Sequence, residues 1–206
     1  MKRTLLTGFG PFGPVADNPS QRLAEHFGRS GAPGHSLMVH VFPVSFCRVA
    51  QQLTSLLGES GDVDFDIVLM LGVNTGEWDW RIERLGTNAD QPESVDMDGE
   101  ISNGGPIIPD EPQELECTLP VWRLVAALKN AGVPAVASNS AGGYLCNHVL
   151  FRSLSRLRTS PGTIAGFVHI PADPATLTPE SNPGNLVFPS FETHVLAIET
   201  ILRELA

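Results

Sequence analysis

Apolar residues recur along the chain in two alternating patterns. Short runs of strand length, such as residues 4–7 and 67–73, are separated by segments in which apolar residues return every three or four positions. The run at 67–73 is apolar almost throughout, which is typical of a strand buried on both faces of a sheet. We therefore predict the α/β class, with a three-layer α/β/α sandwich around a mixed, largely parallel twisted sheet.

Helix signals follow several of these runs. Asn18 is a suitable N-cap and Pro19 suits the first helical position, ahead of an apolar stripe that includes Leu23 and Phe27. Ser45 opens a second amphipathic segment in the same way. Further helices are predicted over residues 121–130, 145–158 and 191–205, and strands over 36–44, 65–73, 78–88, 133–138 and 163–171.

Two long segments have little pattern of their own. Residues 91–120 and 171–185 are rich in proline, glycine and polar residues. Loops of this length inside a compact domain usually serve as binding loops or lids. Because no repeat or linker divides the chain, we expect a single domain over residues 1–206.

Composition and charge limit the kinds of partner that the protein is expected to bind. The 206 residues carry a net charge of −10, and no cluster of basic residues suits a phosphate backbone, so we expect no nucleic-acid partner. No apolar run is long enough to cross a bilayer. The apolar start of the chain stops at Leu6, too early for a signal-peptide core, so we expect no membrane partner and a cytoplasmic protein.

The glycines of "TGFGPFG", residues 7–13, match the G-x-G-x-x-G pattern of dinucleotide sites. Two prolines interrupt this loop, however, and the helix that should meet the pyrophosphate begins only near Pro19. The second strand also lacks a terminal acid for a ribose. A dinucleotide site is therefore disfavoured. Phe9 and Phe12 either wall a small apolar slot or anchor the loop onto the sheet.

Cys146 lies in "GGYLCNHVLF", between a predicted strand and a predicted helix. The three cysteines are widely spaced and fit neither a disulfide framework nor a paired zinc motif, so at least one thiol is free. Free cysteines are mostly buried and inert. This one, however, is predicted at the carboxyl edge of the sheet, where the positive end of a helix dipole stabilises a thiolate. Cys146 is therefore a candidate nucleophile.

A cysteine nucleophile needs a base, and histidine supplies one near neutral pH. His169 ends an apolar strand and reaches the same edge if that strand runs parallel to its neighbours. His148 is only two residues from Cys146, about 200° round the helix, so the two side chains diverge. The alternative for His169 is a hydrogen-bonded histidine at a strand end. The other histidines suit solvated or packing roles: His26, His35, His40 and His194.

A third group should orient the imidazole. Glu83 is an acid within an alternating strand, and Asp79 and Asp90 compete with it. Acids in half-buried strands also commonly pair with a neighbouring arginine, and Arg81 and Arg84 are available. These patterns favour a Cys-His-acid hydrolase without deciding which acid completes it.

Four stretches in this order carry a family resemblance. They are "LLTGFGPFG" with "NPS", "ERLGTN", "SAGGYLCNH" and "GFVHIP". The chain resembles the pyrrolidone-carboxylate peptidases, or type I pyroglutamyl peptidases, which are cysteine peptidases that remove an N-terminal pyroglutamyl residue. The resemblance implies catalytic roles for Glu83, Cys146 and His169. It also implies peptides with N-terminal pyroglutamate as substrates and a homotetramer. Because water can release the acyl group from a cysteine nucleophile, we expect neither a metal nor a cofactor.

The same resemblance implies a substrate pocket. Its walls would be Phe9 and Phe12, with Tyr144 and Leu145 beside them, and the Val73 backbone would hydrogen-bond the ring amide. Asn18 is expected to join this substrate-binding set. A pyroglutamyl ring is small, flat and uncharged, so aromatic walls with a few backbone groups suit it.

The chain departs from the family pattern at two places. Residues 73–76 replace a glutamine and a double glycine, and residues 91–94 replace an arginine and an "IPDN"-like segment. These departures concern loop conformation, substrate affinity and oligomer contacts. Two rival hypotheses stay open: a non-catalytic α/β module that binds a small ligand or peptide N-terminus in the same pocket, and a metallohydrolase that uses Cys146, His148 and His169.

Overall fold

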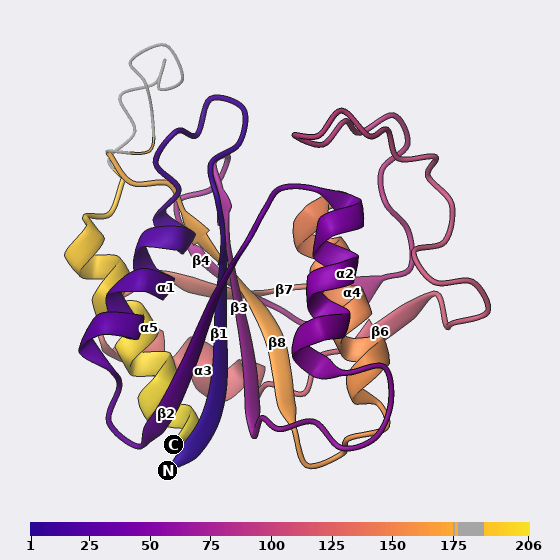
Figure 1. Ribbon diagram of the computed structural model, residues 1–206. Coiled ribbons are helices and arrows are strands. Elements are labelled where there is room, and N and C mark those ends of the chain that lie inside the picture. The colour runs from indigo at the N-terminus through magenta and orange to yellow at the C-terminus, as the bar shows by residue number, and fades with distance from the viewer. Residues whose placement is uncertain (175, 177–187) are drawn as a thin grey trace.

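The computed structural model describes residues 1–174, 176 and 188–206, and within them a central sheet has the strand order β2-β1-β3-β8-β4-β7 (Figure 1). The first four strands in this order run parallel, β4 is antiparallel to β8, and β7 is parallel to β4. The predicted mixed, largely parallel sheet is confirmed. The strands are β1 (Lys2–Phe9), β2 (His35–Phe42), β3 (Ile67–Asn74), β4 (Trp80–Glu83), β7 (Ala135–Ser138) and β8 (Ile164–Pro171).

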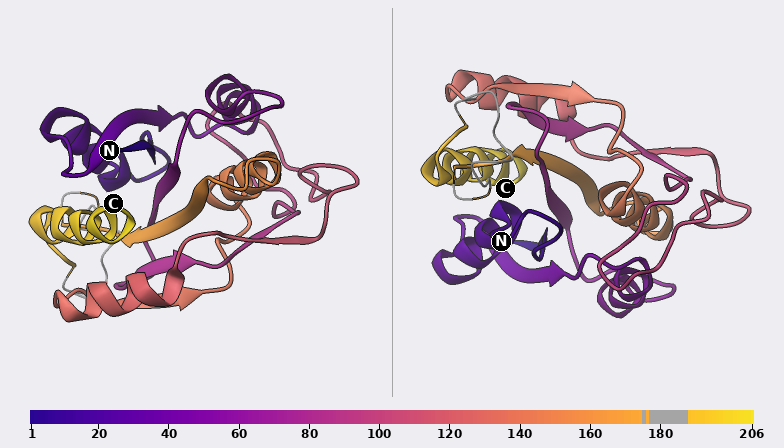
Figure 2. Two further views of the ribbon diagram at one scale, coloured as in Figure 1. Left: turned by 90° about the horizontal axis from the view of Figure 1, so that it is seen from below. Right: turned by 90° about the horizontal axis from the view of Figure 1, so that it is seen from above.

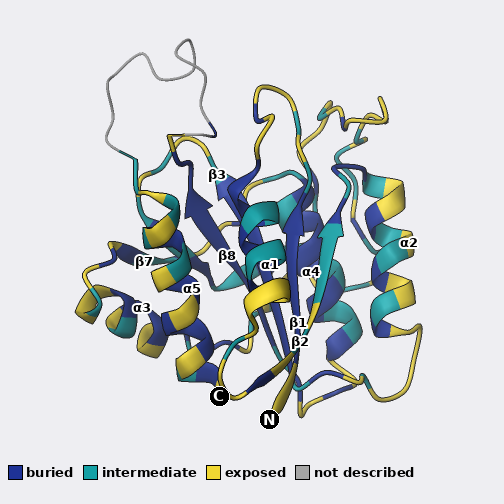
Figure 3. Ribbon diagram, turned by 60° about the vertical axis from the view of Figure 1, so that its left-hand side comes forward, coloured by how far each residue is buried: buried dark blue, intermediate teal, exposed yellow. Residues whose placement is uncertain are grey.

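Helices cover both faces of this sheet, which confirms the three-layer sandwich (Figures 1 and 2). One face carries α1 (Pro19–Ser30), α3 (Val121–Asn130) and α5 (Phe191–Leu205), and the other carries α2 (Phe46–Leu57) and α4 (Leu145–Leu157). A separate apolar cluster fills the space on each face. Because both faces are covered, the central strands β3 and β8 are buried along almost their whole length (Figure 3).

The helix starts follow the local sequence signals. The Asn18 side chain accepts a hydrogen bond from the Ser20 N–H at 3.0 Å, and Pro19 is the first residue of α1. Ser45 caps α2 by accepting from the Arg48 N–H at 3.4 Å. Both predicted N-caps are confirmed. Asn18 also donates a hydrogen bond to the Gly10 carbonyl at 2.9 Å, which ties the loop after β1 to the start of α1.

The single strand predicted over residues 78–88 is wrong. The chain leaves the main sheet at Arg84 and continues as β5 (Leu85–Thr87), which pairs antiparallel with β6 (Glu114–Glu116) in a small second sheet. Gly86 permits this new course, because a Cβ there would lie 3.1 Å from the Phe151 Cα of α4. The glycine lets β5 pack directly on that helix.

The structure describes the first of the two predicted loops but only a small part of the second. Residues 91–120 are described and contain β6 within an otherwise irregular excursion. The second loop, residues 171–185, lies largely outside the described residues. Across the part of the chain that is described, no helix is both long and apolar enough to span a membrane.

Candidate active site

A small, largely apolar pocket opens where β1 and β3 end and α4 begins. All six residues predicted to bind substrate line it, together with the predicted nucleophile and one residue that sequence reasoning missed. A larger hollow of about 480 Å³ between α2 and α4 contains none of the three predicted catalytic side chains. The lining of the small pocket is Phe9, Phe12, Asn18, Val44, Val73, Tyr144, Leu145 and Cys146.

The Cys146 thiol lies against the bare backbone of β3. Cys146 is the second residue of α4, and a Cβ at Gly72 would come within 2.8 Å of its Sγ. Gly72 is paired in register with His169 on β8. The thiol and the imidazole are therefore brought together across two neighbouring parallel strands.

The location predicted for Cys146 is confirmed, but the reasoning that led there needs correction. The thiol lies with the carboxyl ends of β1 and β3, as its shared pocket with Phe9 and Val73 shows. However, β7 runs antiparallel to β8, because it is parallel to β4 and β4 opposes β8. The end of β7 therefore does not define this edge. Residues 139–144 carry the chain from β7 to the start of α4.

His169 and Glu83 form a buried pair. The distance between His169 Nδ1 and Glu83 Oε1 is 2.7 Å, and Glu83 is fully buried. In the antiparallel β4–β8 pairing Glu83 lies opposite Phe167, two positions before His169, so the two side chains meet diagonally on one face. Because the carboxylate accepts from Nδ1, the other ring nitrogen is left for Cys146.

Burial alone would lower the pKa of His169. The charge of Cys146, its hydrogen bond with the ring, and the hydrogen bond and charge of Glu83 together outweigh burial, so that the pKa rises to about 9. The ring therefore carries its proton near neutral pH. An imidazolium facing a thiolate is the reactive form of a cysteine nucleophile.

Neighbouring arginines do not neutralise Glu83. Arg81 binds Glu77 at 2.8 Å and Asp79 at 3.1 Å. The Arg84 guanidinium donates to the side chain of Asn139. The alternative in which Glu83 simply pairs with an adjacent arginine is therefore wrong, and Asp79 is engaged elsewhere.

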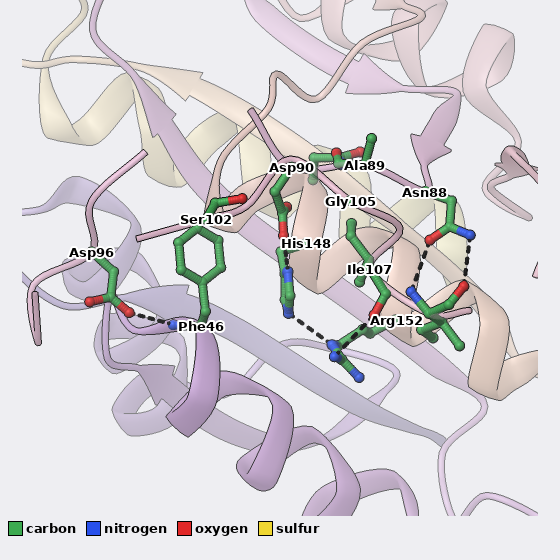
Figure 4. A network of polar contacts seen from close by, with 12 residues as sticks. Phe46, Asn88, Ala89, Asp90, Asp96, Ser102, Gly105, Ile107, His148 and Arg152 are labelled. Carbon is green, nitrogen blue, oxygen red and sulfur yellow. Dashed lines mark hydrogen bonds and ion pairs between the residues drawn. The ribbon is translucent and has the colours of Figure 1, made fainter. Parts of the chain in front are cut away.

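His148 and Asp90 form a second, separate pair (Figure 4). His148 Nδ1 donates to Asp90 Oδ2 at 2.7 Å, and His148 Nε2 accepts from Arg152 Nε at 2.8 Å. Both ring nitrogens of His148 are thus bonded, to Asp90 and to Arg152. Among the described residues no three histidine, cysteine or acidic side chains gather as metal ligands. The proposed trio of Cys146, His148 and His169 is not assembled.

The phenylalanine of β1 both packs and lines the pocket. The Phe9 ring lies 5.9 Å from that of Phe42 and 6.5 Å from that of Phe167, and only 3% of Phe9 is exposed. Phe9 therefore both lines the pocket and packs the loop onto the sheet, so the two interpretations that the sequence left open are both correct for this residue. Gly8 is required for another reason: a Cβ there would lie 2.3 Å from the Ser20 carbonyl oxygen, so it permits close contact with α1.

Asn18 lines the pocket, yet the protein already uses its polar atoms. Its side-chain nitrogen donates to the Gly10 carbonyl at 2.9 Å, and its oxygen accepts from the Ser20 N–H and hydroxyl. These bonds fix the glycine loop over the pocket. The arrangement gives Asn18 a supporting position, and its direct contact with substrate stays a prediction.

The structure also brings up residues that sequence reasoning missed. Gly72 carries no pattern signal, because its role depends on a contact with α4. Gln91 donates its backbone N–H to the Gly143 carbonyl at 2.6 Å, beside the turn before Cys146. The sequence did draw attention to residues 91–94, because they depart from the family pattern, but it gave no role to Gln91.

Comparison with known proteins identifies the family of this chain. Residues 2–204 match the family model described as pyroglutamyl peptidase. The chain belongs to the pyroglutamyl peptidase family. The family resemblance noted in the sequence is thereby confirmed.

Individual pyroglutamyl peptidase relatives match over most of their length. The pyrrolidone-carboxylate peptidase of Pyrococcus furiosus is 33% identical over 210 residues, covering 98% of this chain and 99% of that protein. The one from Clavibacter michiganensis subsp. michiganensis is 36% identical over 171 residues, covering 83% and 79%. The solved structure of the Thermococcus litoralis pyrrolidone carboxyl peptidase superposes with a TM-score of 0.89 at 32% identity, covering 98% and 92%. This chain is similar to them in both sequence and fold.

Proposed function

We propose that this protein is a pyroglutamyl-peptidase I, a cysteine peptidase that removes an N-terminal pyroglutamyl residue from peptides. The observation that carries the proposal is the buried His169–Glu83 pair, with its 2.7 Å hydrogen bond, beside Cys146 in the lining of a small apolar pocket. Membership of the pyroglutamyl peptidase family supports the substrate class.

In the acylation step, the Cys146 thiolate attacks the pyroglutamyl carbonyl carbon. A carbon–sulfur bond forms and the carbonyl electrons move to oxygen. Backbone N–H groups of residues 142–146 would bind this oxyanion, each contributing roughly 3 kcal/mol in comparable sites. When the intermediate collapses, the carbon–nitrogen bond breaks and His169 gives its proton to the departing peptide amine.

In the deacylation step, His169 is neutral and takes a proton from water. The resulting hydroxide attacks the thioester, the carbon–sulfur bond breaks, and pyroglutamate leaves. Thiolate and imidazolium are then restored. Glu83 holds the ring through Nδ1 throughout, which keeps the other nitrogen directed at the reacting atoms. Neither step draws on a metal or a cofactor.

The pocket suits an uncharged lactam. Phe9 and Phe12 supply flat apolar surface, and the Val73 backbone at the end of β3 offers polar groups for the ring amide. Within the lining no acidic side chain is present that would favour a free amino terminus. This chemistry favours pyroglutamyl over glutamyl substrates.

The test is release of a chromophore from pyroglutamyl, prolyl and glutamyl anilides. The wild-type protein should cleave only the first at an appreciable rate, and Cys146→Ala should abolish turnover. Cys47→Ala, at an exposed position on α2, is the matched control and should keep full activity. Binding of pyroglutamyl peptides without turnover by the wild type would favour the non-catalytic module instead.

Three wider expectations belong to the same proposal: one domain over residues 1–206, a homotetramer, and a cytoplasmic location. The homotetramer follows from the family resemblance. A single domain is supported by β1 and β8, which lie far apart in the sequence and both border β3. Light scattering on the purified protein measures its mass in solution, and a monomer would contradict the tetramer.

A further inference from the structure

A second buried histidine–acid pair joins α4 to the segment after β5, and the mechanism above does not use it. His148 is only 5% exposed and lies between Asp90 and Arg152, with its ring packed edge-on against Phe46 at 5.2 Å (Figure 4). Asp90 comes from the segment after β5, whereas Arg152 is one turn further along α4. The pair therefore joins an irregular segment to the helix that carries Cys146.

The protonation pattern of this cluster follows from its donors. Arg152 can only donate, so His148 Nε2 accepts and the ring proton lies on Nδ1, where it binds Asp90. The ring thus links a guanidinium to a carboxylate. Such a chain of hydrogen bonds fixes the position of each group in it, because every bond has one allowed direction.

The segment held by Asp90 reaches the turn before Cys146. Asn147, next to Cys146, makes hydrogen bonds to the Thr87 N–H and carbonyl and to the Ala89 carbonyl. Two residues further on, the Gln91 N–H donates to the Gly143 carbonyl at 2.6 Å. Residues 87–91 are therefore held to α4 by hydrogen bonds and, through Gln91, to the turn that precedes Cys146.

This last bond fixes the direction of one peptide group. In a trans peptide the C=O and N–H point in opposite directions. Because the Gly143 carbonyl points to Gln91, the Tyr144 N–H points away from the 87–91 segment. Among the described residues no acceptor is bonded to that N–H, and Tyr144 provides no side-chain cap for α4.

Glycine at 143 makes the approach possible. A Cβ on Gly143 would lie 2.8 Å from the Cβ of Gln91, closer than such atoms pack. The backbone of the turn and the backbone of the segment can therefore touch only in the absence of a side chain here.

We propose that Asp90, His148 and Arg152 are positioning residues: they hold residues 87–91 so that Gln91 directs the Tyr144 N–H toward the substrate carbonyl oxygen. The inference rests on the proposed function, since it assigns this N–H to the oxyanion of the peptidase reaction. It leaves thiol activation to His169 and Glu83.

The variants are chosen to separate positioning from general stability. Asp90→Ala removes the acceptor for His148, and Asp90→Asn restores an acceptor oxygen. Gly143→Ala separates the turn from Gln91 independently of the buried pair. His35→Ala is the control for His148→Ala, because His35 is equally buried and also has both nitrogens bonded, to Thr4 and the Leu202 carbonyl, at the opposite end of the sheet.

Four quantities are measured on each variant that unfolds cooperatively: kcat and KM on a pyroglutamyl anilide, the rate of Cys146 alkylation by iodoacetamide, and inhibition by a pyroglutamyl aldehyde. The Cys146 Sγ adds to the carbonyl carbon of the aldehyde. The aldehyde oxygen then takes the place of the oxyanion and is bound by the same N–H donors. Loss of one such donor lowers kcat by about a hundredfold or more, so a displaced donor should cost roughly tenfold to a hundredfold.

Asp90→Ala, His148→Ala and Gly143→Ala should lower kcat and aldehyde affinity in parallel, with KM and the alkylation rate changed by less than about threefold. Asp90→Asn should recover most of the loss, and His35→Ala should lower only the melting temperature. Unchanged kcat in Gly143→Ala and Asp90→Ala would overturn the inference, as would equal losses of kcat and alkylation rate. Absence of turnover by the wild type would instead contradict the proposed function.

Discussion

Gly72 on β3 and Cys146 on α4 are in direct contact, and a Cβ at position 72 would lie 2.8 Å from the Cys146 Sγ and 2.6 Å from the Phe167 ring. The site therefore depends on a missing side chain as much as on the groups present. The thiol can approach β3 closely enough to meet His169 only because position 72 is bare.

Gly72→Ala should therefore abolish most turnover while the protein still folds. The added methyl group displaces Sγ or the Phe167 ring, and misplacing a reacting group by about 1 Å costs on the order of a hundredfold in rate. Gly162→Ala is the matched control, because a Cβ there meets no atom within 4 Å. Equal kcat/KM values for the two variants would contradict the proposed placement of the nucleophile.

The pH dependence of turnover should report the proton on His169. Burial opposes this proton, but Cys146 and Glu83 raise the pKa of His169 to about 9, so the protonated ring persists through neutral pH. Activity that needs a proton for the leaving amine should fall as pH rises through about 9.

Glu83→Gln should move this alkaline limit to lower pH, because the variant removes a negative charge that stabilises the imidazolium. The rate at neutral pH should fall at least roughly tenfold. Profiles of kcat/KM against pH for both proteins measure the shift. An alkaline limit that stays in place would show that Glu83 does not act on the His169 ring.

The free energy of unfolding at acid pH should depend on a different histidine. His194 on α5 is fully buried against Trp80, and burial is the main cause that lowers its pKa to about 4. The unfolded chain binds this proton near pH 6.5, so stability is present above that pH and is lost as pH falls toward 4. At 1.36 kcal/mol per pKa unit the loss is about 3 kcal/mol.

His194→Leu removes this titration and should weaken the effect of acid. Urea unfolding at pH 7 and pH 4 should show a smaller loss in the variant than in the wild type, by roughly 2–3 kcal/mol. Identical losses in both proteins would assign the acid sensitivity to other groups.

Substitution of two aromatic residues of the pocket should distinguish an effect on substrate binding from an effect on the stability of the fold. Phe12 is partly exposed, so Phe12→Ala should raise KM for pyroglutamyl substrates with little change in melting temperature. Phe9 also packs on Phe42 and Phe167, so Phe9→Ala should in addition destabilise the fold by about 3–5 kcal/mol. Steady-state kinetics with thermal unfolding checks both, and an unchanged KM in Phe12→Ala would remove it from the substrate pocket.

Local features were predictable from the sequence because their causes are local. The N-caps at Asn18 and Ser45 depend on a few neighbouring residues, and the buried strand β3 is apolar by itself. The fold class follows from the alternation of such elements. His169 was placed at the carboxyl edge correctly because β8 runs parallel to β3, whereas Cys146 reaches that edge although β7 runs the other way.

Features that depend on pairing between distant segments were not predictable. The residue pattern alone did not distinguish Glu83 from Asp79 and Asp90, and only the family resemblance named it. The structure gives the reason, because β4 runs antiparallel to β8 and sets Glu83 diagonally from His169. The break after β4 reflects contact of Gly86 with α4. The bond between Asp90 and His148 joins residues 58 positions apart, and no periodicity indicates it.

The most direct test of the central claim is to trap the covalent intermediate. The wild-type protein is mixed with a reactive pyroglutamyl ester, quenched in acid within the first turnover, digested and examined by mass spectrometry. One pyroglutamyl group should be found as a thioester on the peptide that contains Cys146, and His169→Ala should form it far more slowly. Turnover with no such adduct, or an adduct on another residue, would contradict the assignment of Cys146 as the nucleophile.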